Sequence, residues 1–238
     1  MTSAGEPASS APRVIELTGV SVELGGTSVL RGIDVRLDQR RIAVIGANGS
    51  GKSTFARLLN GLVAPSAGVV RVHGLDVAKN PKRVRQLVGF VFTNPDAQII
   101  MPTVAEDVGF SLRGRGLSRA EVTERTESVL AAYGLSGFGE APAHSLSGGQ
   151  KQLLALASVL VGEPALVVAD EPTTLLDLGN ARRIGDLLID ELDAQTVIVT
   201  HDLELAARCE VALRFEDGRI VSIGDPARVV AEYRAVNA

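Results

Sequence analysis

The sequence is poor in the residues that build disulfides, cysteine-based metal sites and membrane spans. Its 238 residues include one cysteine, no tryptophan and only 3% aromatic residues. A single cysteine, Cys209, excludes an internal disulfide and a cysteine metal cluster, so we interpret it as a small core residue. The longest apolar candidate, residues 153–169, is interrupted by Gly162-Glu163-Pro164. The sequence therefore predicts no membrane-spanning helix.

Charge and the start of the chain exclude two further classes. The formal net charge is −4, which argues against a nucleic-acid partner. Residues 1–12 are rich in serine, alanine and proline, and they lack the basic start and apolar centre of a signal peptide. We predict a disordered tail over residues 1–12 and one domain over residues 13–238, with 45% hydrophobic residues to fill a core.

A glycine-rich stretch lies between a predicted buried strand, residues 41–45, and a predicted helix from Phe55. It fits the phosphate-binding pattern G-x-x-x-x-G-K-[ST]. The glycines let the backbone wrap a phosphate, and the helix N-terminus adds free N–H groups. The lysine reaches the β- and γ-phosphates, and the serine hydroxyl faces Mg²⁺. The stretch consists of Gly46, Ala47, Asn48, Gly49, Ser50, Gly51, Lys52, Ser53 and Thr54.

Two carboxylates end a second hydrophobic strand, residues 165–169. Behind a phosphate-binding loop, such a strand places its first acid, Asp170, beside Mg²⁺. Glu171 then lies one step further and can polarise a water aimed at the γ-phosphate. The alternative is a pair of solvated acids at a strand end.

A further helix start carries the sequence Leu146-Ser147-Gly148-Gly149-Gln150, which also suits phosphate binding. At this point, residues 14–224 resemble the ABC ATPase family, because this signature, the phosphate loop, Asp170-Glu171 and His201 follow the family's order. The resemblance implies two ATP molecules held between two chains, each between one P-loop and the partner's signature. It gives His201 a contact to the γ-phosphate and Asp177 a role across the dimer. The alternative for His201 is an ordinary surface or core histidine, and the alternative for Asp177 is an acid at a helix start.

Within the family, residues 92–98 and 102–108 resemble the energy-coupling-factor (ECF) importers of vitamins and of cobalt or nickel, and the chain's short end favours the biotin-type member. Two residues depart from the pattern. Leu24 stands where the family has an aromatic residue that stacks on adenine. Thr93 stands where it has a glutamine that senses the γ-phosphate, and Gln98 is the alternative sensor.

The resemblance implies an ATP-hydrolysing subunit that uses ATP and Mg²⁺. We expect it on the cytoplasmic face of the membrane, with a transmembrane coupling subunit, a substrate-binding membrane subunit and a second ATPase, identical or related. The rivals are a soluble ABC-type switch acting on nucleic acid or ribosome and a P-loop kinase. Residues 93–112 are the expected docking segment.

The predicted fold class is α/β: a P-loop core with a mixed parallel sheet, an antiparallel β start and an inserted helical subdomain over about residues 94–162. Strands are expected over residues 13–17, paired with 20–24, and over 29–37, 69–72, 87–92 and 196–200. A hairpin around Asp217-Gly218 is expected next. Helices are expected after the capping box at Ser118, from Ser147-Gly148-Gly149-Gln150, over residues 180–192 and after Asp225-Pro226.

Overall fold

The structure is a computed structural model that describes residues 13–174 and 176–237. Its centre is a six-stranded sheet in the order β10-β9-β3-β8-β7-β6. The four inner pairings, from β9 to β6, are parallel, and β10 joins β9 antiparallel. The bounds are β3 (Arg41–Gly46), β6 (Val88–Val91), β7 (Leu166–Asp170), β8 (Gln195–Val199), β9 (Val211–Glu216) and β10 (Arg219–Gly224). This is the predicted mixed sheet.

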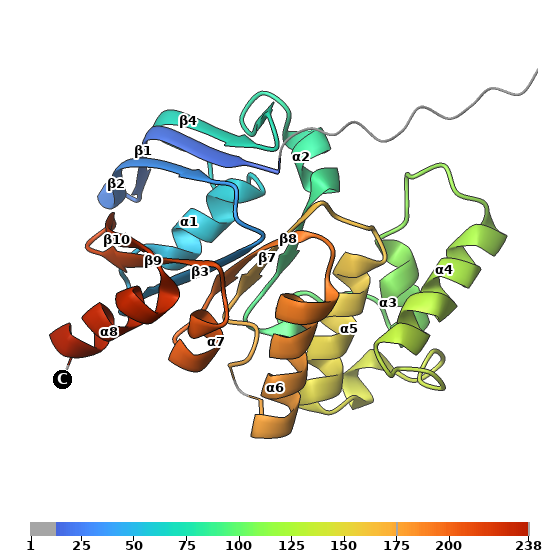
Figure 1. Cartoon of the computed structure of the whole chain (residues 1–238). Coiled ribbons are helices and arrows are strands. Elements are labelled where there is room, and N and C mark those ends of the chain that lie inside the picture. Colours follow the sequence, from blue (N-terminus) through green and yellow to red (C-terminus); the bar gives the residue numbers. More distant parts are fainter. Residues whose placement is uncertain (1–12, 175, 238) are drawn as a thin grey trace, which may run out of the picture.

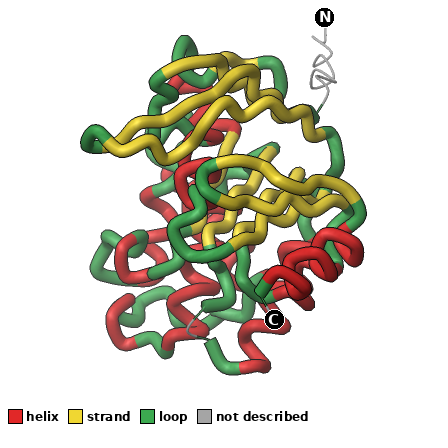
Figure 2. Tube along the Cα trace, turned by 90° about the vertical axis from the view of Figure 1, so that its left-hand side faces the viewer, coloured by secondary structure: helices red, strands yellow, loops and turns green. Residues whose placement is uncertain are grey.

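A second, antiparallel sheet has the order β2-β1-β4-β5. Its strands are β1 (Ile15–Leu24), β2 (Thr27–Leu37), β4 (Ala67–Val72) and β5 (Leu75–Asp76). Figure 2 shows the two sheets as separate layers. Gly25 and Gly26 connect β1 to β2, and both have the positive φ that a tight two-residue hairpin requires. The predicted antiparallel start is confirmed.

Helices cover both faces of the central sheet (Figure 1). One of them, α1, lies between the two sheets, and α3 to α7 lie on the other side. The bounds are α1 (Lys52–Leu59), α2 (Pro81–Leu87), α3 (Val104–Phe110), α4 (Arg119–Ala132), α5 (Gly148–Leu160), α6 (Leu178–Asp186), α7 (Leu203–Ala207) and α8 (Pro226–Val236). Short turns of helix are η1 (Pro95–Ala97), η2 (Ala143–Ser145) and the π-helical η3 (Leu187–Glu191).

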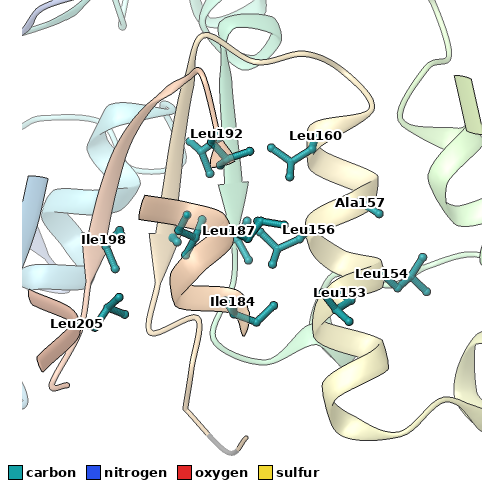
Figure 3. Close-up of a cluster of buried hydrophobic side chains, with 14 of the residues drawn as sticks. Leu153, Leu154, Leu156, Ala157, Leu160, Ile184, Leu187, Leu192, Ile198 and Leu205 are labelled. Atoms are coloured by element: carbon teal, nitrogen blue, oxygen red, sulfur yellow. The ribbon is translucent and has the colours of Figure 1, made fainter. Parts of the chain in front are cut away.

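Two hydrophobic cores follow from the alternation of side chains along the central strands. In β3, Ile42 and Val44 join the core shared with α1 and the antiparallel sheet, whereas Ala43 and Ile45 join the core under α5 and α6. Figure 3 shows the second core, where leucines of α5 face Ile184, Leu187 and Ile198. Because both faces of β3 are covered, all six of its residues are buried. This rigid strand delivers the chain to Gly46.

Three details differ from the sequence predictions. Residues 15–24 form one bulged strand paired with β2 and β4, so the expected pairing of 13–17 with 20–24 is wrong. Leu87 ends the unpredicted helix α2, and the strand begins at Val88. The helix expected over 180–192 is α6 followed by η3. The guanidinium of Arg41 holds carbonyls in and after η3: its Nε donates to the Ile189 carbonyl (2.6 Å), and its Nη1 donates to the Ala194 carbonyl (2.8 Å).

The predicted helix starts agree with the structure. Ser118 and Ser147 each form a capping box, and the side chain of Asp225 caps α8. Within residues 13–174 and 176–237, no helix has the length and apolarity needed to cross a membrane. The predicted disordered tail, residues 1–12, lies outside the described residues.

Candidate nucleotide-binding site

The loop from Gly46 to Thr54 leaves the end of β3 and enters α1. Gly46, Gly49 and Gly51 have φ values of 148°, 79° and 105°. A Cβ on Gly46 would lie 2.3 Å from the Phe215 carbonyl oxygen, and one on Gly51 would lie 2.7 Å from the Leu30 side chain. The two positions therefore require glycine for space as well as for conformation. The loop is further held by Gly218, whose N–H donates to the Ser50 carbonyl (3.1 Å).

Lys52 is buried at the start of α1 and turned back over its own loop. Its Nζ donates to the carbonyls of Gly46 (2.8 Å) and Ala47 (2.9 Å). Burial lowers the pKa of Lys52, and the nearby charges of Glu171 and Asp170 oppose that shift. A desolvated ammonium surrounded by backbone oxygens gains from an anion that brings compensating charge. The position and the electrostatics of Lys52 suit a phosphate ligand.

Ser53 and Asp170 converge from α1 and β7. The Ser53 hydroxyl donates to Asp170 Oδ1 over 3.0 Å. Burial raises the pKa of Asp170, an effect opposed first by the hydrogen bond from Ser53 and then by the charge of Arg57. A buried carboxylate and a hydroxyl are the hard oxygen ligands that Mg²⁺ accepts. Within the described ranges, no group of three or more acidic, histidine or cysteine side chains has the geometry to hold a metal ion by itself. The residues thus fit a Mg²⁺ that takes its other ligands from phosphates and water.

Glu171 and His201 form a close pair at the ends of neighbouring strands. Glu171 Oε2 lies 2.6 Å from His201 Nδ1 and accepts from the Thr174 hydroxyl (3.1 Å). The Glu171 N–H donates to the Val199 carbonyl (2.9 Å), which fixes the residue against β8. Its φ of 55° is unusual for a residue with a Cβ. This conformation turns the carboxylate out of the strand line and beside the phosphate loop. Thr174, which the sequence did not indicate as a site residue, is a further hydrogen-bond partner of Glu171.

The signature residues lie elsewhere. Ser147 caps α5, and its N–H in turn donates to Gln150 Oε1 (2.9 Å). Gly149 lies against Asn180 of α6, where a Cβ would come within 2.5 Å of the side chain. The hollow beside the phosphate loop measures about 220 Å³, and no signature residue lines it. Its lining consists of Val29, Asn48, Gly49, Gly51, Lys52, Ser53, Thr54 and Glu171. One chain therefore does not bring its signature to its own loop.

The remaining predicted residues have diverse surroundings. The Thr93 hydroxyl donates to the backbone carbonyl of Asp170 (2.8 Å), which places Thr93 beside a predicted magnesium ligand. Gln98 is already engaged at both ends: its Oε1 accepts from the Phe92 N–H, and its Nε2 donates to the Ala155 carbonyl. Asp177 caps α6 through Asn180, whose hydrogen bonds lower the pKa of Asp177.

Leu24 lies beside the β1–β2 turn, and 48% of its surface is exposed. Leu24 does not line the hollow beside the phosphate loop. Val29, on the next strand β2, does line it. The sequence singled out Leu24 and missed Val29. The signal that could have identified Val29 is its position shortly after Gly25-Gly26, on the strand that runs back toward the phosphate loop.

The comparisons with known proteins decide the family. The family model described as "ABC transporter" matches residues 30–174, a stretch that contains the phosphate loop, the signature and the Asp170-Glu171 strand end.

The chain belongs to the ABC transporter family.

Relatives match this ABC ATPase over nearly its whole length. A putative ABC transporter ATP-binding protein of Deinococcus radiodurans is 51% identical, covering 93% of this chain and 97% of the relative. The biotin transport ATP-binding protein BioM of Rhizobium etli is 43% identical, covering 94% and 99%. The energy-coupling factor transporter ATP-binding protein EcfA of Methanocaldococcus jannaschii is 38% identical, covering 89% and 78%. The chain is accordingly an ATP-binding and ATP-hydrolysing transport ATPase.

Solved structures agree. CbiO1 from Clostridium perfringens, described as part of the ABC transporter complex cbiONQ, has a TM-score of 0.82 and 31% identity, covering 94% of this chain and 92% of that one. A dimeric ATP-binding cassette in a post-hydrolysis state, bound to ADP and phosphate, has a TM-score of 0.75 and 26% identity, covering 89% and 98%. The predicted α/β fold class is confirmed.

Proposed function

We propose that this ABC ATPase is the ATP-hydrolysing subunit of an ECF-type importer, and that its transported micronutrient is biotin. Cobalt or nickel and another vitamin are the alternatives. The convergence of Lys52, Ser53, Asp170 and Glu171 at the phosphate loop carries the proposal, because these side chains can hold the phosphates and Mg²⁺ and polarise the attacking water. The choice of biotin rests on the similarity to BioM proteins, and no contact in the site selects it.

The geometry supports a division of labour among the site residues. Lys52 exchanges its two carbonyl acceptors for the β- and γ-phosphates. Ser53 and Asp170 would hold Mg²⁺, which neutralises charge that develops on the phosphates. Glu171 accepts a hydrogen bond from the attacking water and aligns it with the γ-phosphate. His201, 2.6 Å from Glu171, orients that carboxylate and reaches the same phosphate with its other ring nitrogen.

Hydrolysis in this proposal requires two chains. The signature at the start of α5 does not line the chain's own phosphate loop, yet its free N–H groups and glycines suit a phosphate. A second ATPase, either another copy or a related chain, would bring its own signature to this loop. Asp177, at the start of α6, would then face the partner. Because its side chain already caps α6, its role across the dimer is to fix the shape of that loop.

The helical region offers a place for a transmembrane coupling subunit. A groove of about 760 Å³ between α3 and α4 is lined by Met101, Phe110, Val122 and Thr126, among others. The Thr126 hydroxyl is buried and has no hydrogen-bond partner among the described residues. Ile100, beside Met101, is 62% exposed. The groove also carries charged side chains such as Arg113 and Glu127, so it suits an amphipathic helix that offers both apolar and polar contacts. Through this subunit, the ATPase would serve a substrate-binding membrane subunit from the cytoplasmic face of the membrane.

Uptake and pull-down experiments test the proposal together. Deletion of the gene should abolish uptake of labelled biotin at low concentration, and the wild-type gene should restore it, whereas Lys52→Ala should not. Mass spectrometry of the complex purified from membranes should identify the membrane subunits and the second ATPase. If the deletion leaves biotin uptake unchanged but abolishes uptake of cobalt, nickel or another vitamin, that compound is the transported solute instead of biotin. Recovery of the chain with ribosomes or nucleic acid would favour the soluble switch instead.

Cysteine crosslinking tests the docking segment. Burial raises the pKa of Cys209 to about 12, so the native thiol reacts slowly and an introduced cysteine dominates. Ile100→Cys should crosslink to a membrane subunit. Leu62→Cys, at an exposed position outside the helical region (49% exposed), is the control that should not. An active Ile100→Cys complex without a crosslink would contradict docking at this segment.

A further inference from the structure

Helix α5, which begins with the signature, is fastened to the segment that follows Thr93 by an ion pair. Lys151 Nζ lies 2.7 Å from Asp96 Oδ1. Lys151 comes directly after the signature in the first turn of α5, and Asp96 lies in η1. The Lys151 side chain is 19% exposed. A lysine in the first turn of a helix faces the positive end of the helix dipole, which is unfavourable. Helix stability alone therefore does not account for this residue, whereas its pairing with Asp96 does.

Two further contacts fasten the same segment to α5. Gln98 Nε2 donates to the Ala155 carbonyl over 2.9 Å. The buried carboxylate of Asp107 joins both sides: its Oδ2 accepts from the Ser158 hydroxyl (2.8 Å), and its Oδ1 accepts from the Ile100 and Met101 N–H groups. The contacts thus occur at the first, middle and last parts of α5, so the segment and the helix form one mechanical unit.

The other end of the segment reaches the chain's own catalytic strand. Thr93, three residues before Asp96 in the sequence, donates a hydrogen bond to the carbonyl of Asp170. The segment therefore lies between two phosphate-handling parts of one chain: the magnesium ligands of its own site and the signature that serves the partner's site.

We propose that the Asp96–Lys151 pair is a positioning clasp that keeps the signature turn, residues 147–150, in register with the segment that carries Thr93. Both residues act through their neighbours and touch no nucleotide. Breaking the pair lets the first turn of α5 shift against Thr93, so the partner's ATP meets a misplaced signature. The chain's own phosphate loop is unaffected. The proposal rests on the two-chain arrangement proposed above.

Steady-state kinetics of the assembled transporter provide the first test. Asp96→Asn and Lys151→Gln should each lower kcat about two- to fivefold, the range that partly exposed ion pairs produce. The double variant should be no worse than either single one. Exchanging the charges, with Asp96→Lys and Lys151→Asp together, should restore most of the rate, because an aspartate also suits the first turn of a helix. ATP affinity of the isolated chain should remain at the wild-type value in every variant.

A matched control separates this role from a general loss of charge. Arg125→Gln removes a cation from the same helical region and breaks its ion pair with Glu163. It should leave kcat unchanged. A rate for Asp96→Asn equal to that of Arg125→Gln, or independent losses that add in the double variant, would overturn the clasp.

Hydrogen exchange of the isolated chain tests the clasp without any membrane partner. Asp96→Asn should speed exchange together at residues 96–101 and at the first turn of α5, and leave α1 as in the wild type. Arg125→Gln should change neither segment. If the exchange result holds while no membrane complex can be purified, the proposed transporter is wrong and the clasp stands. Unchanged exchange in Asp96→Asn would refute the clasp whatever the chain's partner is.

Discussion

His201 Nδ1 lies 2.6 Å from Glu171 Oε2, although the two residues are 30 positions apart in the sequence. They meet because β7 and β8 are parallel neighbours, so the residues that follow each strand lie at the same edge of the sheet. The Glu171 carboxylate is only 16% exposed, whereas the His201 side chain is 65% exposed. The other carboxylate oxygen of Glu171 and the other ring nitrogen of His201 are outside this contact, and in the proposed mechanism they meet the attacking water and the γ-phosphate.

Glu171→Gln should abolish hydrolysis and retain ATP binding. The amide keeps the shape of the side chain but cannot polarise the attacking water. We expect ATP to accumulate in a closed two-chain state, measured by retention of labelled ATP after rapid gel filtration. Asp202→Asn, at a carboxylate that caps α7 nearby, is the control and should turn over normally. Hydrolysis by Glu171→Gln at the wild-type rate in the assembled complex would assign the water to another group.

Leu24 should make base discrimination weak. It offers no ring, and base–aromatic stacking contributes about 1–3 kcal/mol. GTP should compete with ATP better than in relatives with an aromatic residue at this position, and Leu24→Tyr should tighten both nucleotides. Leu24→Met, which changes shape without adding a ring, should leave both dissociation constants unchanged. A strong preference of the wild type for ATP would show that another residue supplies the stack.

Thr93→Ala should lower the ATPase rate of the assembled transporter by about ten- to a hundredfold, the effect of about 1–3 kcal/mol from one lost contact at the transition state. The Thr93 hydroxyl is hydrogen-bonded to the backbone carbonyl of Asp170, the proposed magnesium ligand, and from there it can hold a bridging water. Thr93→Ser keeps the hydroxyl and should retain most of the rate.

Gln98→Ala should mainly uncouple hydrolysis from transport, because both ends of the amide already bind backbone groups. The ratio of ATP hydrolysed to solute transported measures this effect. A normal rate for Thr93→Ala beside an inactive Gln98→Ala would give the γ-phosphate contact to Gln98.

His73 should make the fold sensitive to mild acid. Its Nε2 is hydrogen-bonded to Gln195 Oε1 over 2.8 Å, and burial lowers its pKa. A histidine whose folded pKa is lowered binds its proton more readily when unfolded, so stability is full above the unfolded value of about 6.5 and decreases as the pH falls below it.

The thermal midpoint should therefore drop more between pH 7.5 and 5.5 in the wild type than in His73→Asn. Asparagine tolerates the positive φ of 48° at this position. His144→Asn, at an exposed histidine, should behave like the wild type. Equal drops in all three proteins would exclude His73 as the source.

Local chemistry made much of the fold predictable. Three helix starts were predictable, because a capping side chain and its partner lie within one turn of each other; the capping residues are Ser118, Ser147 and Asp225. The strand before Gly46 was clear because both of its faces are buried. Helix α7 was missed since its five residues are too few to show a helical period. Helix α2, before Val88, was missed because its seven residues are mostly charged or polar and bury only Val84, which leaves no helical hydrophobic period to detect.

Contacts between residues far apart in the sequence could not be predicted. Asp170 and Glu171 could be named from a strand end, yet nothing local indicated that Glu171 would meet His201 or that Asp96 would meet Lys151. Such contacts depend on strand order and helix packing, which the chain determines only when it folds as a whole. The engagement of Gln98 with Phe92 and Ala155 is of the same kind, and the choice between Thr93 and Gln98 as the γ-phosphate sensor stays a prediction for the two variants above.

Lys52 keeps its ammonium on the carbonyls of Gly46 and Ala47. Any anion that enters must therefore compete with two acceptors already in place. Inorganic phosphate offers few contacts in exchange, whereas a triphosphate offers the whole loop as well as the lysine. A nucleotide that enters the loop must therefore replace both carbonyls at the lysine, and the phosphates that do so release the Gly46 and Ala47 carbonyls from their hydrogen bonds.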